Sequence, residues 1–217
     1  MAGEKNMVIL ASSYNIGGFE IKLDYLIRNL DKKKFNITFL LVYPLYKARH
    51  LPEEVRNKYR AFLSWDEVNL IELDMKYRYD VSLIFKVAGL LRKMQADILY
   101  YTSLGAGTFI APAAALIAGV GYKVKEVQTI LKGQYPAPLR GIDQYLTSRM
   151  DRVIVASYFL RDLLVRKLHL TPAKIQVVPN GIDLQKFRKT AVKSGLKEQM
   201  DLQKKRWIKI FGENLMK

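Results

Sequence analysis

Two adjacent glycines, Gly17 and Gly18, stand where a short apolar run gives way to an apolar pattern of helical spacing, in ILASSYNIGGFEIKLDYLIRNL. Glycine adopts backbone angles that are closed to other residues and lets a ligand approach the main chain. The helix that follows offers unpaired N–H groups and the positive end of its dipole. These residues predict a loop that binds a phosphate group, and a tight turn without a ligand is the alternative.

The spacing of this loop differs from that of two common nucleotide-binding motifs. The loop does not match G-x-x-x-x-G-K-[ST], which disfavours a nucleoside triphosphatase. It also does not match G-x-G-x-x-G followed by an acidic residue for the ribose, which weakens a dinucleotide-binding interpretation. The spacing therefore favours neither of these two ligand classes.

The composition offers few metal ligands. The chain has 217 residues and no cysteine, and its two histidines, His50 and His169, lie far apart in the sequence without a nearby carboxylate pattern. A zinc site is therefore not expected, and we expect no bound metal or other cofactor. The absence of cysteine also fits a cytoplasmic protein.

The chain is strongly basic, with 36 Lys and Arg against 20 Asp and Glu and a net charge of +16. This excess favours anionic partners, which include nucleic acid, phosphorylated small molecules and acidic membrane surfaces. No dense basic tract interleaved with aromatic residues stands out, which disfavours a nucleic-acid-binding protein. The N-terminal residues MAGEKNMVIL lack the long apolar core of a signal peptide.

One uncharged segment, Ile98 to Tyr122, is long enough to span a bilayer. Its middle consists of Gly, Ala, Ser, Thr and Pro, and its glycines cluster as they do in loops. We therefore predict a buried strand, a glycine turn and a buried helix rather than a transmembrane span.

Seven short apolar runs alternate with segments of helical periodicity. Several of the runs are continuous, as in strands that are buried on both faces of a parallel sheet. The alternation predicts a doubly wound, mostly parallel α/β sheet, which is a Rossmann-like fold with right-handed crossovers. The predicted strands are Met7–Ala11, Ile37–Val42, Val68–Leu73, Ile98–Tyr101, Val124–Thr129, Val153–Ala156 and Ile175–Val178. The predicted helices are Phe19–Leu30, Pro52–Phe62, Val81–Met94, Thr108–Ala118, Leu139–Met150 and Tyr158–Leu168.

Ligands of such sheets bind beyond the carboxyl ends of the strands, where the strand order reverses. The loops of interest are therefore those that follow strands: SSYNIGGFE, TSLGAGT and ILKGQYP. After the sixth strand comes Ser157, a good helix N-cap.

Two stretches resemble one enzyme family. NIGGFEIKLDYLIRNL resembles the N-terminal GGxE signature of the family 4 glycosyltransferases of the GT-B fold, and VVPNGID followed by Phe187 resembles the end of their N-terminal domain. The likeness covers about Met7 to Phe187. The second stretch also has a purely structural reading, because Asn180-Gly181 supplies positive φ angles and Asp183 bonds locally in a turn.

The resemblance implies the N-terminal half of a GT-B fold, in which two Rossmann-like domains face each other across the substrate cleft. In that family the C-terminal domain binds most of the nucleotide-sugar donor and the N-terminal domain mainly recognises the acceptor. Asn15, Gly17 and Gly18 would contact the donor diphosphate or the acceptor. Thr102, Ser103, Lys132 and Arg140 would line the cleft. Asn180, Gly181 and Asp183 would form the turn that leads to the second domain.

Two departures from the family pattern limit the inference. Leu131 stands where the family often has a histidine, and leucine can neither shuttle a proton nor hydrogen-bond a sugar, so no catalytic residue is assigned. The chain also ends before a donor pocket, and Arg206 to Lys217 looks like the first strand and turn of a second domain. We expect residues 1–187 to form the acceptor-side domain and residues 188–217 to form a linker helix and the beginning of a missing C-terminal domain.

The sequence therefore predicts a glycosyltransferase part that is inactive alone, and the resemblance implies a retaining enzyme without a bound metal. Its expected partners are a nucleotide sugar, a glycan or lipid-linked acceptor and the missing C-terminal domain. Peripheral association with an anionic inner membrane face is expected from the charge and from the partly amphipathic segment Leu83 to Met94. The alternatives are a non-catalytic partner subunit or binding protein with a GT-B half-fold, and a basic nucleic-acid-binding domain.

Overall fold

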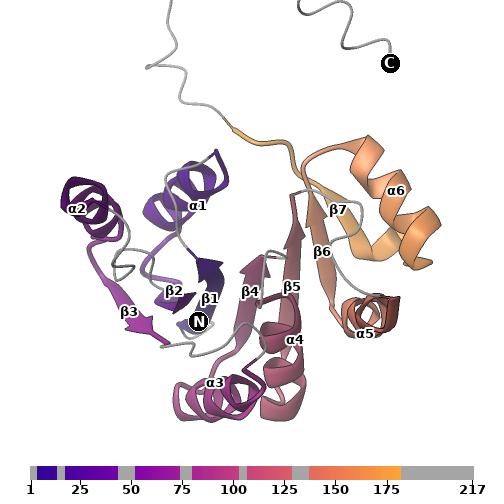
Figure 1. Ribbon diagram of the computed structural model, residues 1–217, viewed down its shortest axis with the longest axis horizontal. Helices are drawn as coiled ribbons and strands as arrows, with labels where there is room; N and C mark the ends of the chain where they lie inside the picture. Colours follow the sequence, from indigo (N-terminus) through magenta and orange to yellow (C-terminus); the bar gives the residue numbers. More distant parts are fainter. Residues whose placement is uncertain are drawn as a thin grey trace, which may run out of the picture. The chain divides into compact units, whose positions relative to one another are not determined.

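Seven parallel strands form one sheet in the computed structural model, which describes residues 4–13, 18–43, 52–73, 80–102, 107–128 and 137–181. The order across the sheet is β3-β2-β1-β4-β5-β6-β7, and every adjacent pair is parallel (Figure 1). The predicted doubly wound parallel sheet is confirmed. The strands are β1 (Lys5–Ser13), β2 (Phe35–Tyr43), β3 (Val68–Glu72), β4 (Ile98–Thr102), β5 (Tyr122–Val127), β6 (Arg152–Val155) and β7 (Ile175–Val177).

Six α-helices connect these strands, and each predicted helix begins and ends within two residues of an observed one. The helix after β6 begins as its sequence requires, because the Ser157 side chain accepts a hydrogen bond from the backbone N–H of Leu160 at 3.2 Å. The helices are α1 (Gly18–Asn29), α2 (Glu53–Phe62), α3 (Ser82–Lys93), α4 (Gly107–Ala118), α5 (Ala137–Ser148) and α6 (Tyr158–Leu168). A short 3-10 helix, Pro172–Lys174, precedes β7.

The helices cover both faces of the sheet. Successive residues of a strand point to opposite faces, so neighbouring residues of a buried strand lie in different hydrophobic cores. Ile9 of β1 lies in one hydrophobic core with Leu23 and Ile27 of α1. The next residue, Leu10, lies in the other core, to which α3, α4 and α6 contribute. Residues 37–42 of β2 are all buried, which explains why this strand is a continuous apolar run.

The strand order reverses between β1 and β4. The chain runs from β1 outward to β2 and β3, and then crosses to β4 on the other side of β1, from where it continues to β7 (Figure 1). Leu10 and Tyr101 are register partners in these two central strands. The carboxyl ends of β1 and β4 therefore lie side by side, at the position where ligands of such folds bind.

The uncharged segment from Ile98 to Tyr122 forms β4, α4 and the first residue of β5. The strand and the helix predicted for it are confirmed, and both lie against the core. Within the ranges given above, every helix is too short or too polar to cross a bilayer.

The chain divides into two compact units, Met1–Asn180 and Gly181–Lys217. The sheet and the six helices belong to the first unit. In the second unit the structure describes Gly181 alone. The predicted domain boundary at residue 187 and the predicted linker helix lie outside the described residues.

Candidate functional site

The carboxyl ends of β1 and β4 and the starts of α1 and α4 are the part of the fold where the sequence predicts a ligand site. Residues 14–17 join β1 to α1 and residues 103–106 join β4 to α4, and both segments lie outside the described residues. Asn15, Gly17, Ser103, Lys132 and Asp183 therefore remain predictions. The described residues of this edge show how its frame is built.

Gly18 is the first residue of α1 and is exposed. A Cβ atom built on it would meet no heavy atom within 4 Å, so packing within the described chain does not require glycine at this position. The first turn of α1 has N–H groups that lack intrahelical partners, and these attract anions. The predicted phosphate-binding loop before this helix start stays a prediction, because residues 14–17 lie outside the described part.

Gly107, the first residue of α4, is a glycine for a different reason. Its backbone N–H donates a hydrogen bond to Ser12 Oγ at 2.8 Å, and a Cβ atom on it would lie 2.5 Å from the same oxygen. Glycine therefore allows α4 to start directly against the end of β1. This contact joins residues 95 positions apart and links the start of α4 to the carboxyl end of β1.

The remaining predicted residues lie in three different places. Thr102 ends β4, and its side chain is buried, with 1% of the residue exposed, on the same face of the sheet as its register partner Glu126. Arg140 lies in the first turn of α5, and its side chain is outside the described part. Asn180 and Gly181 follow β7 and are exposed.

Glu126 is the centre of a polar cluster that the sequence analysis did not identify. It lies at the carboxyl end of β5 with its side chain 1% exposed, and it forms an ion pair with Lys22 of α1, whose side chain is 17% exposed. Its carboxylate also accepts hydrogen bonds from the Tyr100 hydroxyl and from Gln128 Nε2. Burial raises the pKa of Glu126, and the hydrogen bond and charge of Lys22 act in the opposite direction.

The residue before it, Lys125, forms a second buried cluster on the opposite face. Lys125 Nζ lies 2.6 Å from Asp143 Oδ1 and 2.6 Å from Thr147 Oγ1, both on α5. Burial lowers the pKa of Lys125, while the charge of Asp143 acts to raise it. Nearby, burial raises the pKa of Tyr101, and Asp143 adds to this rise. In the described part of the chain, the Tyr101 hydroxyl is buried without a hydrogen-bond partner.

The sequence alone could have indicated that Lys125 and Glu126 need buried partners. Lys125 and Glu126 are adjacent charged residues inside the predicted strand, between the apolar residues Val124 and Val127. A charged side chain in such a strand must find a partner, because its transfer from water without one is costly. Their partners could not be read from the sequence, since Lys22 is 104 residues away from Glu126.

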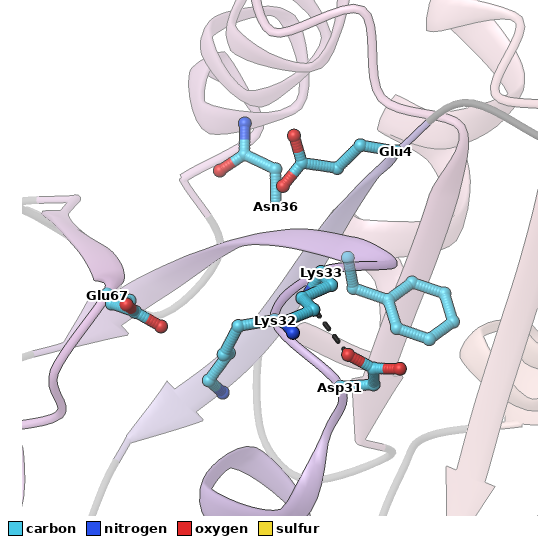
Figure 2. A pocket seen from close by; sticks show the side chains of 7 residues that line it. Glu4, Asp31, Lys32, Lys33, Asn36 and Glu67 are labelled. Atoms are coloured by element: carbon cyan, nitrogen blue, oxygen red, sulfur yellow. Dashed lines mark hydrogen bonds between the residues drawn. The ribbon is translucent and has the colours of Figure 1, made fainter.

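A hollow of about 530 Å³ opens on the side of the sheet where the strands begin, near the amino ends of β1 and β2 (Figure 2). Lys32 lies in it, and its Nζ donates to the backbone carbonyl of Ile27. Burial lowers the pKa of Lys32, against the opposing charge of Glu67. The hollow is lined by Glu4, Asp31, Lys32, Lys33, Phe35, Asn36 and Glu67. It lies away from the strand ends where ligands of doubly wound sheets bind, so we do not assign it to the site.

Among the described residues, no three His, Asp or Glu side chains come together as a metal site requires. The described arrangement supplies a helix start with open space beside it, a buried carboxylate paired to a lysine, and backbone groups at two adjacent strand ends. Of these groups, the helix start is one that can bind an anion.

Comparison with known proteins shows which protein family this chain resembles. The family profile described as Glycosyltransferase Family 4 matches residues 16–186. Among curated proteins, the UDP-Gal:alpha-D-GlcNAc-diphosphoundecaprenol alpha-1,3-galactosyltransferase of Escherichia coli is 26% identical over 126 residues. The aligned part is 56% of this chain and 32% of that protein.

Solved structures share the fold at low sequence identity. Anabaena Alr3699/HepE in complex with UDP and glucose has a TM-score of 0.66 at 14% identity, covering 91% of this chain and 50% of that chain. A glycosyltransferase from Rickettsia africae has a TM-score of 0.59 at 13% identity, covering 90% and 48%. The UDP-GlcNAc 2-epimerase from Neisseria meningitidis bound to UDP-GlcNAc has a TM-score of 0.57 at 14% identity, covering 90% and 54%. The chain thus spans about half the length of these structures and 32% of the curated relative.

Proposed function

The chain belongs to glycosyltransferase family 4, and we propose that it forms the acceptor-side half of an enzyme that transfers a sugar from a nucleotide-sugar donor. The observation that carries this proposal is the family match over residues 16–186, which covers α1 to α6 and the strands β2 to β7. The fold alone would not choose this activity, because epimerases of nucleotide sugars share it.

The proposed donor is a sugar linked to UDP, and the proposed acceptor is a sugar carried on a lipid diphosphate. Support for the donor comes from the UDP complexes of the Anabaena protein and from the UDP-Gal of the Escherichia coli enzyme. Support for the acceptor comes from the diphosphoundecaprenol in the name of that enzyme. Both ligands contain a diphosphate, which is the chemistry that an exposed helix start can bind.

In the proposed enzyme the donor is bound by a second domain, which corresponds to the half of the matched structures that this chain does not cover. Transfer needs donor and acceptor to be held together while the charge on the departing diphosphate is stabilised. We propose a retaining reaction without a bound metal, as the family resemblance implies, in which the nucleotide sugar is a substrate and not a cofactor.

The first test of this proposal is the substitution Gly18→Val. A Cβ at this position has free space, so the fold should persist, while the larger side chain blocks the approach of a phosphate to the backbone. We expect at least a tenfold weaker affinity for farnesyl diphosphate or UDP, because a hydrogen bond to a charged group contributes about 1.5–3 kcal/mol. Isothermal titration calorimetry measures the affinity, and circular dichroism verifies the fold.

The matched control is Gly89→Val, since a Cβ atom on Gly89 of α3 would likewise meet no heavy atom within 4 Å. This variant should bind as the wild type does. Stronger loss for farnesyl diphosphate than for UDP would support the acceptor role, and the reverse would support a donor role. Equal affinities of wild type and folded Gly18→Val would contradict the proposed contact.

A second test concerns the division of labour between the two halves. We expect the 217-residue chain alone to transfer no sugar from UDP-galactose or other nucleotide sugars to lipid-linked acceptors, because one wall of the cleft cannot hold both substrates. The measurement is product formation from a radiolabelled donor. Authentic transfer by the purified chain would place the donor site within these residues and refute the proposed arrangement.

A further inference from the structure

Glu126 joins three separate parts of the fold at the carboxyl edge of the sheet. Its Oε1 accepts hydrogen bonds from Lys22 Nζ of α1 and from Gln128 Nε2, which follows β5. Its Oε2 accepts from the hydroxyl of Tyr100 in β4. One buried carboxylate therefore connects a helix of one layer to two neighbouring strands.

Core packing does not explain a carboxylate at this position. The flanking strand residues Val124 and Val127 are buried, and strands that are covered on both faces are normally apolar. An ionised group in such a place loses its hydration, and a well-packed apolar residue of similar size is often as stable or more stable. A buried ion pair of this kind can instead select one arrangement of the elements that it joins.

The element that Glu126 holds is α1. The apolar side of α1 packs on the sheet through Leu23 and Ile27, and such contacts are non-directional, so they permit small shifts of the helix. Asp24 accepts a hydrogen bond from Trp65 Nε1 at 2.7 Å, which ties α1 toward the β3 side of the sheet. The Lys22–Glu126 pair ties it toward β5. The two links lie in the first two turns, just after Gly18.

We propose that Glu126 is a positioning residue that, through Lys22, fixes the first turns of α1 over the carboxyl ends of β4 and β5. The position of Gly18 relative to the ends of the central strands then depends on this ion pair. The consequence for ligand binding rests on the proposed function, whereas the positioning of the helix does not.

The test uses two variants that break the pair and one that preserves it. Glu126→Gln keeps the size and hydrogen-bonding groups of the side chain and removes its charge, and Lys22→Met removes the cation. Lys22→Arg keeps the cation and should rescue the wild-type behaviour. The matched control is Arg28→Gln, which breaks the ion pair between Arg28 and Asp24 within the same helix.

The first measurement is hydrogen exchange of the 217-residue protein, analysed by peptide. Exchange in peptides that cover residues 18–30 should be about tenfold faster in Glu126→Gln and Lys22→Met, because the first turns of α1 open more often. Peptides from α4 and α6 should be unchanged, and Lys22→Arg and Arg28→Gln should behave as the wild type does. Unchanged exchange in α1, or faster exchange throughout the chain, would overturn the proposal, since the latter is the result expected of a residue that only adds stability.

The second measurement is the affinity for farnesyl diphosphate and for UDP. Affinity for one of them should fall about tenfold in Glu126→Gln and Lys22→Met and recover in Lys22→Arg. Wild-type affinity in the two pair-breaking variants would overturn the link from position to binding. If the wild type binds neither compound while α1 exchange still changes, the positioning is supported and the proposed ligand is refuted, so the two failures are distinguishable.

Discussion

The ionisation of Glu126 is governed first by its burial, which raises its pKa above the ordinary value. The groups that face it are Lys22 from α1, Tyr100 from β4 and Gln128, and the hydrogen bonds of Lys22 and Gln128 oppose this rise. A carboxyl group whose pKa is raised by folding binds its proton more tightly in the native state than in the unfolded state. Its contribution to stability is therefore fully present below the unfolded pKa of about 4.3 and is lost as the pH rises through the folded pKa.

We predict that the wild type loses stability relative to Glu126→Gln as the pH is raised from about 4 to 7. The difference should amount to about 1.4 kcal/mol for each unit by which the folded pKa exceeds the unfolded one. The two proteins differ at this one residue, so the comparison reports on Glu126 itself. Urea unfolding of both proteins at several pH values measures the effect. Parallel stability curves would show that folding does not perturb this carboxyl group.

At the scale of elements, β5 forms ion pairs with helices on both faces of the sheet. Lys125 points to one face and pairs with Asp143 of α5, while Glu126 points to the other face and pairs with Lys22 of α1. Neighbouring strand residues alternate between faces, so two adjacent residues of opposite charge can hold helices on both sides. The loops that follow β1 and β5 lead into these same two helices.

The two side chains of the Lys125–Asp143 pair differ in burial. We therefore predict that removing one or the other lowers the free energy of unfolding by different amounts. The Lys125 side chain is 2% exposed and that of Asp143 is 17% exposed. Asp143→Ala leaves the more deeply buried charge unpaired and should destabilise the protein by about 3–5 kcal/mol. Lys125→Met leaves a carboxylate that water can partly reach, so its cost should be smaller.

The double variant Lys125→Met with Asp143→Ala should be more stable than Asp143→Ala alone, because it leaves no unpaired buried charge. Urea unfolding followed by circular dichroism measures all three. Equal costs of the two single substitutions, or costs that add in the double variant, would contradict the role of the ion pair.

For the molecule as a whole, the basic charge and α3 together favour a surface that binds anionic membranes. The buried side of α3 packs into the core through Leu83, Val87 and Leu91, as its apolar pattern requires. On its outer side Phe85 is 70% exposed, beside the exposed Lys86. The net charge of +16 attracts the protein to an acidic surface, and an exposed aromatic ring can then enter the interface.

We therefore predict that the protein co-sediments with liposomes that contain phosphatidylglycerol at low salt and is released at high salt. Charge reversal of Lys86 and Lys93 on α3 should weaken binding by tenfold or more, since each basic residue contributes about 1 kcal/mol near an acidic surface. Reversal of Lys33 and Lys34, which are exposed in the turn after α1, changes the net charge equally and should have a smaller effect. Failure of the wild type to sediment at low salt would remove the proposal.

Local patterns in the chain were sufficient to predict the elements and the family of this protein. Continuous apolar runs such as Ile37–Val42 predict buried parallel strands because side chains on both faces avoid water, and helical periodicity marks the segments between them. The glycine pair before α1 and the VVPNGID turn indicated the glycosyltransferase family, which the family match confirms. Gly18 is the first residue of α1, and the ligand loop predicted before it stays a prediction.

The contacts between distant residues became known only from the folded chain. Ser12 contacts Gly107, Lys22 pairs with Glu126, and Lys125 pairs with Asp143. No local pattern identifies which residues become these partners. They depend on the order of the strands, which places β1 beside β4 and β4 beside β5. The seven strands take this order when they pack between two layers of helices. The partners of a buried charge are therefore fixed by the sheet and not by the residues next to it in the chain.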